Sequence, residues 1–410
     1  MTSLQSPASA REPSWHGVNP LLRDPAWLSN PWPSLHRLRE VAPVNETPLG
    51  IWRLSRYADC VRLQREVRCG VRHRDGTQPR RPVEDSEPGE FMLLQDPPNH
   101  TRLRKLVAKA FTPRAVESWR VRARAIAKER VTHALDAGKM DAIAELALPV
   151  PSELICELLG VPVADRDRFT QWTADATHGL SGILAAPDKR AAAVAASEQL
   201  GAYMSALIEE RRARPGDDLL DELIRAGEDG DRLTPGELIA QSIGLLIAGF
   251  ETTIGLIGNG LRVLIENPAE LAKLRARPEL VANAVEECLR CEGPVMLAPR
   301  ILHEDAEFGG ILIPADSEVF VLIASANRDP AQFADPDRFD IERANAKEHI
   351  AFGGGTHLCL GAHLARMEAQ EAIGALVART RSLELAEGEV AWGASLFRVP
   401  ARLPLVVVAA

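Results

Sequence analysis

Cysteine is scarce in this chain and is spread along it. Six cysteines occur among 410 residues, too scattered for the disulfide framework of a small secreted protein. Cys288 and Cys291 form a Cys-x-x-Cys pair, but neither a second such pair nor paired histidines accompany it. Because both also lie within a helical pattern, we interpret them as core residues of a helix rather than as a zinc or redox site.

A long apolar run and an excess of positive charge are also missing. The longest apolar stretch, Ile243 to Phe250, is followed by Glu251 and is far too short to cross a bilayer. The first 20 residues lack the apolar core of a signal peptide. The net charge of −9 argues against nucleic acid as a partner, because a phosphate-binding face usually leaves a basic excess. The sequence therefore predicts a cytoplasmic protein without a membrane anchor.

The most informative stretch runs from Phe352 to Gly361 and reads FGGGTHLCLG. Its three consecutive glycines allow unusual backbone angles and let a flat partner approach the main chain. The residues after Gly361 have apolar side chains at helical spacing. Cys359 thus stands at the start of a helix, where N–H groups and the helix dipole favour a thiolate. A thiolate with one open face suits a haem iron as axial ligand, whereas a lone Cys-Gly pair would indicate only a buried cysteine beside a turn.

With Phe352, His357, Cys359 and Gly361 at these spacings, the stretch resembles the cysteine-ligand loop of the cytochrome P-450 family. The resemblance extends from about residue 40 to the end of the chain. It implies haem b as cofactor, with Cys359 as the axial ligand of the iron. It also implies a mainly α fold with small β-sheets (α+β), in which haem lies between a long distal helix and a proximal helix preceded by the cysteine loop.

The rest of the chain divides into helical and β-like stretches that fit this fold. Apolar residues follow a helical period almost throughout a body at about 98–295. Alternating or β-branched runs predict strands at about 40–60, 300–323 and 383–408. Because no internal repeat or low-complexity tract interrupts the chain, we expect residues 1–410 to form a single cytochrome P-450 domain, with its cysteine-ligand loop at 352–361.

The longest helical pattern, residues 235–267, has an unusual centre that reads Ala248-Gly-Phe-Glu-Thr-Thr253. A glycine costs about 1 kcal/mol relative to alanine inside a helix, and a threonine can bond back to a carbonyl one turn earlier. Read alone, the segment fits a solvent-facing glutamate and two helical threonines. It also resembles the family's Ala-Gly-x-Asp/Glu-Thr-Thr segment. That resemblance implies that Ala248 and Gly249 border the distal haem face, that Thr252 hydrogen-bonds dioxygen and that Glu251 relays protons.

Four basic residues match positions that hold the haem propionates in this family. His100 and Arg104 are four residues apart in a predicted helix and share one face, which by itself indicates only a solvated surface. The resemblance assigns both to a propionate, and it adds Arg300 and His357. Arginine suits this role because its planar fork binds carboxylates through two charge-assisted hydrogen bonds.

A second charged motif is predicted to be structural. Glu287 and Arg290 match the family's Glu-x-x-Arg pattern, and their spacing lets them pair on one helix face. We expect Arg338, in the Pro-Asp-Arg-Phe coil, to be the third member of this cluster. The cluster would fix the coil that carries Cys359.

The substrate and the electron donor are predicted less directly. Only 51 residues follow Cys359, so we expect no attached flavin or iron–sulfur domain and electrons from a separate ferredoxin and ferredoxin reductase, originally from NAD(P)H. An acidic ferredoxin is expected to dock on the basic cluster of Arg102, Lys105, Lys109 and Arg114. The predicted substrate pocket is apolar, which indicates a small hydrophobic substrate. Its expected lining is Phe91, Leu94, Ile243, Ile247, Val295, Leu297, Ala298, Leu396 and Phe397.

The sequence therefore predicts a haem-thiolate monooxygenase. It would insert one oxygen atom of O2 into a hydrophobic organic molecule, by hydroxylation or epoxidation of a fatty acid, macrolide, terpenoid or drug-like compound. Three alternatives remain open: a peroxygenase driven by hydrogen peroxide, a haem-binding sensor or carrier without turnover, and a helical scaffold without haem. The Glu251–Thr252 pair favours the use of dioxygen, because neither a peroxygenase nor a carrier needs a proton relay.

Overall fold

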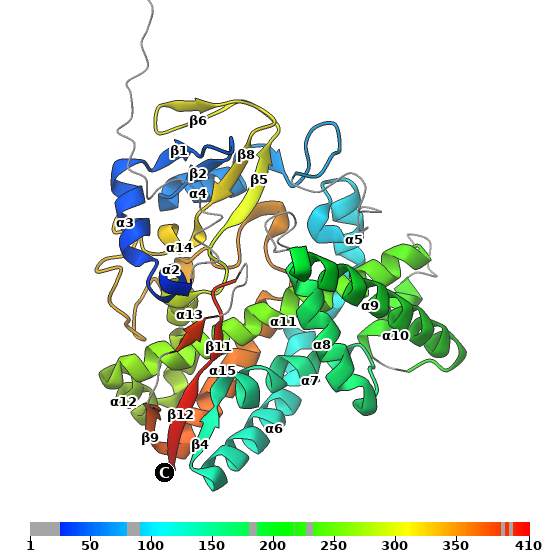
Figure 1. The fold of residues 1–410 in the computed structure, drawn as a ribbon, viewed down its shortest axis with the longest axis vertical. Helices are drawn as coiled ribbons and strands as arrows, with labels where there is room; N and C mark the ends of the chain where they lie inside the picture. The colour runs from blue at the N-terminus through cyan, green and yellow to red at the C-terminus, as the bar shows by residue number, and fades with distance from the viewer. Residues whose placement is uncertain are drawn as a thin grey trace, which may run out of the picture.

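The fold is mainly helical, with small sheets at two places on its edge (Figure 1). The computed structural model describes residues 25–79, 91–179, 187–216, 218–226, 233–386, 390–392 and 397–410. Its α-helices are α2 (Pro25–Ser29), α3 (Trp32–Val41), α4 (Tyr57–Arg65), α5 (Asn99–Val107), α6 (Pro113–Ala137), α7 (Pro149–Leu158), α8 (Arg166–Thr177), α9 (Pro187–Ala213), α10 (Leu219–Ala226), α11 (Pro235–Glu266), α12 (Pro268–Ala276), α13 (Val281–Glu292), α14 (Ile323–Ala326) and α15 (Ala362–Arg379).

The strands form one five-stranded sheet, one three-stranded sheet and two ribbons. Strands β1 and β2 form an antiparallel pair within the predicted β-like stretch 40–60, with Asn45 opposite Arg53, and β2 runs parallel to β8. Arg300 lies on β5, opposite Val319 of β8. The five-stranded sheet has the spatial order β1 (Val44–Glu46), β2 (Trp52–Leu54), β8 (Glu318–Val321), β5 (Ala298–Leu302) and β3 (Cys69–Gly70). The three-stranded sheet has the order β4 (Lys139–Asp141), β12 (Pro404–Ala409) and β9 (Thr380–Leu385). One ribbon pairs β6 (Ala306–Phe308) with β7 (Ile311–Ile313), and the other pairs β10 (Ala391–Trp392) with β11 (Pro400–Arg402).

Helix α11 runs through the middle of the molecule (Figure 1) and contacts α7, α8, α9, α13 and α15. Its start is fixed by a capping box, in which Thr234 Oγ1 accepts from the Glu237 N–H and the Glu237 side chain accepts from the Thr234 N–H. Among the described helices, it alone is long and apolar enough to span a membrane by length and composition, and 56% of its most apolar window is buried within the protein. Its apolar surface therefore serves the core of this fold.

The core around α11 also positions the last long helix, α15. Leu261 of α11 and Ile373 of α15 are completely buried in one cluster with residues of α13 and the three-stranded sheet. Gly260 lets the helices approach, because a Cβ there would lie 2.9 Å from the Ile373 side chain. This packing holds α15 against α11, and the cysteine loop directly precedes the N-terminal end of α15. The predicted fold class, mainly α with small sheets, is confirmed.

Candidate active site

The cysteine loop folds into a compact turn directly before α15. The Cys359 N–H donates to the Phe352 carbonyl at 2.9 Å and closes the loop. Gly355 has a φ of +63°, and a Cβ on this residue would lie 2.0 Å from the Gln64 carbonyl oxygen at the end of α4. Both the backbone angle and the close approach require glycine here. The glycine run therefore fixes the path of the chain that presents Cys359.

The Cys359 side chain is accessible although it lies deep within the protein. Its solvent-exposed fraction places it among the exposed residues, yet burial among protein atoms raises the pKa of the thiol. The Gly361 N–H and the guanidinium groups of Arg104 and Arg366 favour the thiolate and oppose this rise. A Cβ added at Gly361 would meet nothing within 4 Å. The sulfur is thus recessed, open on one side, and surrounded by groups that favour a metal-bound thiolate.

One face of α11 is partly exposed in the middle of an otherwise buried helix. It carries Ile243, Ile247, Ala248, Glu251 and Thr252, which recur at helical spacing. The Thr252 hydroxyl donates to the Ala248 carbonyl at 2.9 Å, the back-bond predicted from the sequence. The hydroxyl oxygen keeps acceptor capacity for a ligand. At the neighbouring Gly249, an added Cβ would meet nothing within 4 Å, so a small ligand can approach the helix backbone there.

The predicted propionate partners gather between α5, β5 and the cysteine loop. The rings of His100 and His357 lie 4.4 Å apart, and both His100 Nδ1 and His357 Nε2 are buried without a hydrogen-bond partner. Burial, together with His357 and Arg104, lowers the pKa of His100 to about 4. Arg300 is only 7% exposed, and burial lowers its pKa. Its one side-chain hydrogen bond in the described structure goes to the Pro299 carbonyl.

This cluster fits the anionic edge of a haem. Buried guanidinium and imidazole groups are costly to leave without acceptors. Neither Arg104 nor Arg300 has a carboxylate within ion-pair distance in the described part of the chain. Two propionates would supply the missing acceptors, and the recessed Cys359 would supply an iron ligand. When bound, the haem iron supplies the binding and reductive activation of dioxygen, assisted by electron density from the thiolate.

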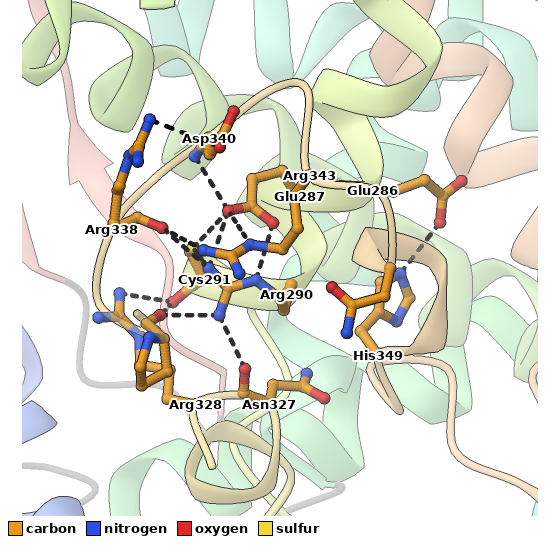
Figure 2. Close-up of polar contacts among 12 residues, drawn as sticks. Glu286, Glu287, Arg290, Cys291, Asn327, Arg328, Arg338, Asp340, Arg343 and His349 are labelled. Carbon is orange, nitrogen blue, oxygen red and sulfur yellow. Dashed lines mark hydrogen bonds and ion pairs between the residues drawn. The ribbon is translucent and has the colours of Figure 1, made fainter. Parts of the chain in front are cut away.

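The predicted Glu287–Arg290 pair is present and fully buried (Figure 2). Arg290 Nε and Nη2 donate to the Glu287 carboxylate at 2.7 and 2.8 Å. The Arg290 guanidinium also donates to the carbonyls of Asn327 and Pro336, at 3.0 and 2.8 Å. These bonds fasten α13 to the coil that leads into the cysteine loop.

The prediction that Arg338 is the third member of this cluster is wrong. Arg343 takes that place, because its Nε donates to Glu287 Oε1 at 3.0 Å. The Arg338 side chain is 62% exposed and lies 3.6 Å from Asp340, while its carbonyl accepts from Arg290 and Arg343 (Figure 2). Since that carbonyl points into the cluster, the side chain of the same residue points outward.

Sequence reasoning missed a second charged cluster beside the first. Glu286 accepts from Arg366 Nε of α15 at 2.7 Å, and its Oε2 lies 3.1 Å from His349 Nε2. Burial opposes ionisation of Glu286, but the hydrogen bonds from His349 and Arg366 lower its pKa to about 2. The Arg366 guanidinium also lies 4.4 Å from the centre of the Phe352 ring. This cluster links α13, the coil, the cysteine loop and α15.

The predicted substrate contacts fall into several groups. Phe91 packs against α11 over Gly244, where a Cβ would lie 2.1 Å from its ring, and it shares one apolar cluster with Ile243 and Ile247. Leu297 instead packs near α3, and Phe397 is buried in the core around α11. Ala298 begins β5 of the five-stranded sheet, and Val295 packs in the same apolar cluster. Leu94 ends the short 3-10 helix Met92–Leu94, and Leu396 lies outside the described residues.

A buried acid lies between the two helices that frame the site. Glu368 of α15 is only 3% exposed, and its carboxyl contacts the Thr253 hydroxyl of α11. Burial raises the pKa of Glu368 from 4.5 to about 8. Between pH 4.5 and about pH 8 the Glu368 carboxyl therefore stays protonated in the folded protein, whereas the unfolded chain releases that proton. Stability falls as pH rises through this window, by at most about 1.4 kcal/mol per pH unit.

Replacing Glu368 by glutamine is therefore expected to stabilise the protein more at pH 8 than at pH 5. The amide keeps an acceptor for Thr253 and has no charge to bury. Thermal unfolding followed by circular dichroism at both pH values measures the effect. Glu371→Gln is the matched control, because Arg124 and Arg120 lower the pKa of Glu371, so this change should destabilise at pH 8. An equal gain for Glu368→Gln at both pH values would contradict the prediction.

Known proteins agree with this fold and site. The family model "Cytochrome P450" matches residues 71–387. The cytochrome P450 monooxygenase PikC of Streptomyces venezuelae is 42% identical over 376 residues, covering 89% of this chain and 88% of that protein. The vitamin D(3) 25-hydroxylase of Pseudonocardia autotrophica is 41% identical over 365 residues, covering 88% of each chain. The structure of P450BioI in complex with a fatty-acid-ligated acyl carrier protein superposes with a TM-score of 0.87 at 34% identity, covering 93% of this chain and 100% of that one.

The helical fold with a recessed, open cysteine before α15 defines a haem-thiolate type of protein. The chain belongs to the cytochrome P-450 family and is a monooxygenase of the kind found in bacteria. The family binds haem and uses dioxygen together with a reductant.

Proposed function

We propose that this monooxygenase binds haem b through Cys359 and inserts one oxygen atom of O2 into a small hydrophobic molecule. The observation that carries the proposal is the Cys359 thiol, which is accessible to solvent and stands in the glycine loop directly before α15. His100, Arg104, Arg300 and His357 would hold the two propionates. His100 Nδ1 and His357 Nε2 are buried without a hydrogen-bond partner in the described structure, and Arg300 is buried, which supports this role.

Glu251 and Thr252 are proposed to deliver protons to dioxygen. Thr252 donates to the Ala248 carbonyl and retains an oxygen that can accept a further hydrogen bond. Glu251 precedes it on the same partly exposed stripe of α11, so it can exchange protons with solvent. A relay of this kind distinguishes a dioxygen-using enzyme from a carrier.

The substrate is proposed to contact Phe91 and the α11 residues Ile243 and Ile247. These side chains form an apolar, partly exposed group next to Ala248 and Gly249. A site of this kind binds ligands mainly through apolar contact. The similar protein of Pseudonocardia autotrophica is named for hydroxylation of vitamin D(3). We propose that the enzyme works in the cytoplasm.

The spectrum of the reduced, carbon-monoxide-bound protein tests the haem proposal. A band far to the red of that of a globin is expected for the native protein, and Cys359→His should move it to the globin position. Screening hydrophobic compounds for a low-to-high-spin shift then finds substrates. Turnover with NAD(P)H, ferredoxin and reductase, but not with hydrogen peroxide alone, supports the monooxygenase over the peroxygenase. Absence of turnover under both conditions would favour a sensor or carrier.

The ferredoxin is proposed to dock on Lys105, Lys109 and Arg114. These side chains are exposed along α5 and the turn into α6. Arg102, the fourth member of the predicted cluster, pairs instead with Glu237 at the start of α11. The docking face therefore consists of three cations.

Reversing two of these charges, as Lys105→Glu with Lys109→Glu, is expected to slow reduction by an acidic ferredoxin at low ionic strength by about tenfold or more. Stopped-flow reduction under carbon monoxide measures the rate, and dithionite reduction checks that the haem is intact. Lys139→Glu is the control, because Lys139 is an exposed residue of strand β4, far from α5 (Figure 1). A rate that responds neither to these changes nor to salt would exclude this face.

A further inference from the structure

Asp96 lies at the junction between the proposed propionate cluster and the proposed substrate wall. It stands between the 3-10 helix Met92–Leu94 and α5. Its carboxylate accepts from the backbone N–H groups of Val71 and Arg72, each at 3.0 Å. Oδ1 of the same carboxylate lies 3.6 Å from His357 Nε2. One side chain thus contacts the loop after β3 and the loop that carries Cys359.

The chain after β3 is shaped to receive this carboxylate. Gly70, the last residue of β3, passes so close that a Cβ would lie 2.4 Å from Asp96 Oδ2. Gly70 pairs with Ile301 of β5, next to Arg300. Any larger residue at position 70 would push Asp96 away from the two N–H groups. The close approach is therefore part of the geometry that holds Asp96.

Arg72 fastens the same two stretches a second time. Its Nε donates to the Leu94 carbonyl at 2.7 Å, and its Nη1 donates to the Gly76 carbonyl at 2.9 Å. The Arg72 carbonyl lies 3.0 Å from His303 Nε2. The described stretches 70–77 and 91–96 are thus joined through one carboxylate and one guanidinium.

The position of Phe91 depends on this junction. Phe91 stands five residues before Asp96 and packs over Gly244 of α11. The Gln95 and Leu94 N–H groups bond within the short turn to Met92 and Phe91, at 3.1 and 3.0 Å. The turn therefore moves as one piece with Asp96. A displacement of the carboxylate would shift the aromatic ring along the exposed face of α11.

We propose that Asp96 is a positioning residue that couples the substrate-side wall at Phe91–Leu94 to the haem edge at His357. It touches neither substrate nor iron and acts through the Val71 and Arg72 N–H groups and through His357. The inference rests on the proposed haem site. A carboxylate suits this place because two backbone N–H donors converge on it and the His357 imidazole lies within ion-pair distance, and hydrogen bonds to a charged acceptor are stronger than neutral ones.

The test compares two iron ligands in haem-loaded protein. 4-Phenylimidazole places a phenyl ring on the substrate side, whereas cyanide reports on the iron and needs no such space. Asp96→Ala is expected to weaken 4-phenylimidazole binding by about tenfold, as measured by Soret titration, since at least two hydrogen bonds to a charged group are lost. Cyanide binding should change less than twofold. Asp96→Asn should show an intermediate loss of 4-phenylimidazole affinity, because the asparagine amide nitrogen cannot accept a hydrogen bond from a backbone N–H.

Asp75→Asn is the matched control. Asp75 lies in the same stretch and accepts from Thr77, but it is exposed and has no bond to residues 91–96. It should leave both affinities unchanged. Equal losses for the two ligands, loss of haem by both Asp96 variants, or unchanged affinity for 4-phenylimidazole would each overturn the proposal. A wild-type carbon monoxide band at the globin position would instead refute the thiolate assignment, whatever the Asp96 variants show.

Discussion

Glu287→Ala is expected to yield protein that expresses without bound haem. Both Glu287 and Arg290 have side chains with 0% exposure. Removing the carboxylate leaves Arg290 buried without a counter-charge, and breaking such a pair costs about 3–5 kcal/mol. The Asp340 N–H, which bonds Glu287 at 3.0 Å, also loses its acceptor. The coil that leads into the cysteine loop would then lose its anchor on α13, so Cys359 would no longer be held in place. The haem-to-protein ratio after purification measures the effect.

Arg343 and Arg338 provide a matched pair for this test. Arg343→Ala removes a guanidinium that donates to Glu287 and to the carbonyls of Ala334, Asp335 and Arg338. It should therefore also lower haem content and thermal stability. Arg338→Ala removes only an exposed side chain near Asp340 and should change the free energy of unfolding by about 0.5 kcal/mol or less. Normal haem content in Glu287→Ala, or equal losses in the two arginine variants, would show that this cluster does not anchor the cysteine loop.

These two arginines also show where sequence reasoning reaches its limit. The Glu287–Arg290 pair was predictable, because helix geometry alone brings residues three apart onto one face. The partner from the coil was not, because a proline-rich coil has no fixed period. Which of two arginines turns inward depends on the local backbone path, and here the Arg338 carbonyl takes the inward position.

The same distinction, between local sequence patterns and long-range contacts, applies to the rest of the site. The helical spacing of α11 and the glycines around Cys359 are local patterns, and their resemblance to the cytochrome P-450 family made the fold class and the proposed ligand predictable. The contacts of Glu286 with Arg366 join residues 80 positions apart, and those of Asp96 with Val71 join residues 25 apart. No local pattern marks such pairs. Two adjacent acids at 286 and 287 were the only sign that α13 presents carboxylates to two different clusters.

Thr252→Ala is expected to leave haem and substrate binding unchanged but to divert electrons to hydrogen peroxide. The Thr252 hydroxyl lies on the partly exposed stripe of α11 that also carries Ala248, and its bond to the Ala248 carbonyl orients it. Alanine has a higher helix propensity than threonine, and the partly exposed Thr252 side chain is not part of the buried core, so α11 should remain intact. Without the hydroxyl, protons would reach dioxygen without a fixed donor, and the oxygen–oxygen bond would break less often than peroxide escapes.

The measurement compares product and peroxide formed for each NAD(P)H consumed, using the compound with the largest spin shift. The product formed for each NAD(P)H consumed should fall by about tenfold or more in Thr252→Ala, a size typical for loss of one acid–base group. The dissociation constant of the compound, measured from the spin shift, should stay within twofold of the native value. Thr252→Ser keeps a hydroxyl and should retain most of the coupling.

Thr253→Ala separates chemistry from helix structure. Thr253 is buried at 3% exposure and contacts Glu368 of α15, so its loss should lower thermal stability without uncoupling turnover. If both threonine variants released peroxide equally, the cause would be a disturbed helix. These neighbours face different surroundings on one continuous helix, so we expect the partly exposed Thr252 hydroxyl, and not the buried Thr253 hydroxyl, to meet dioxygen. Unchanged coupling in Thr252→Ala would remove Thr252 from the proposed proton path.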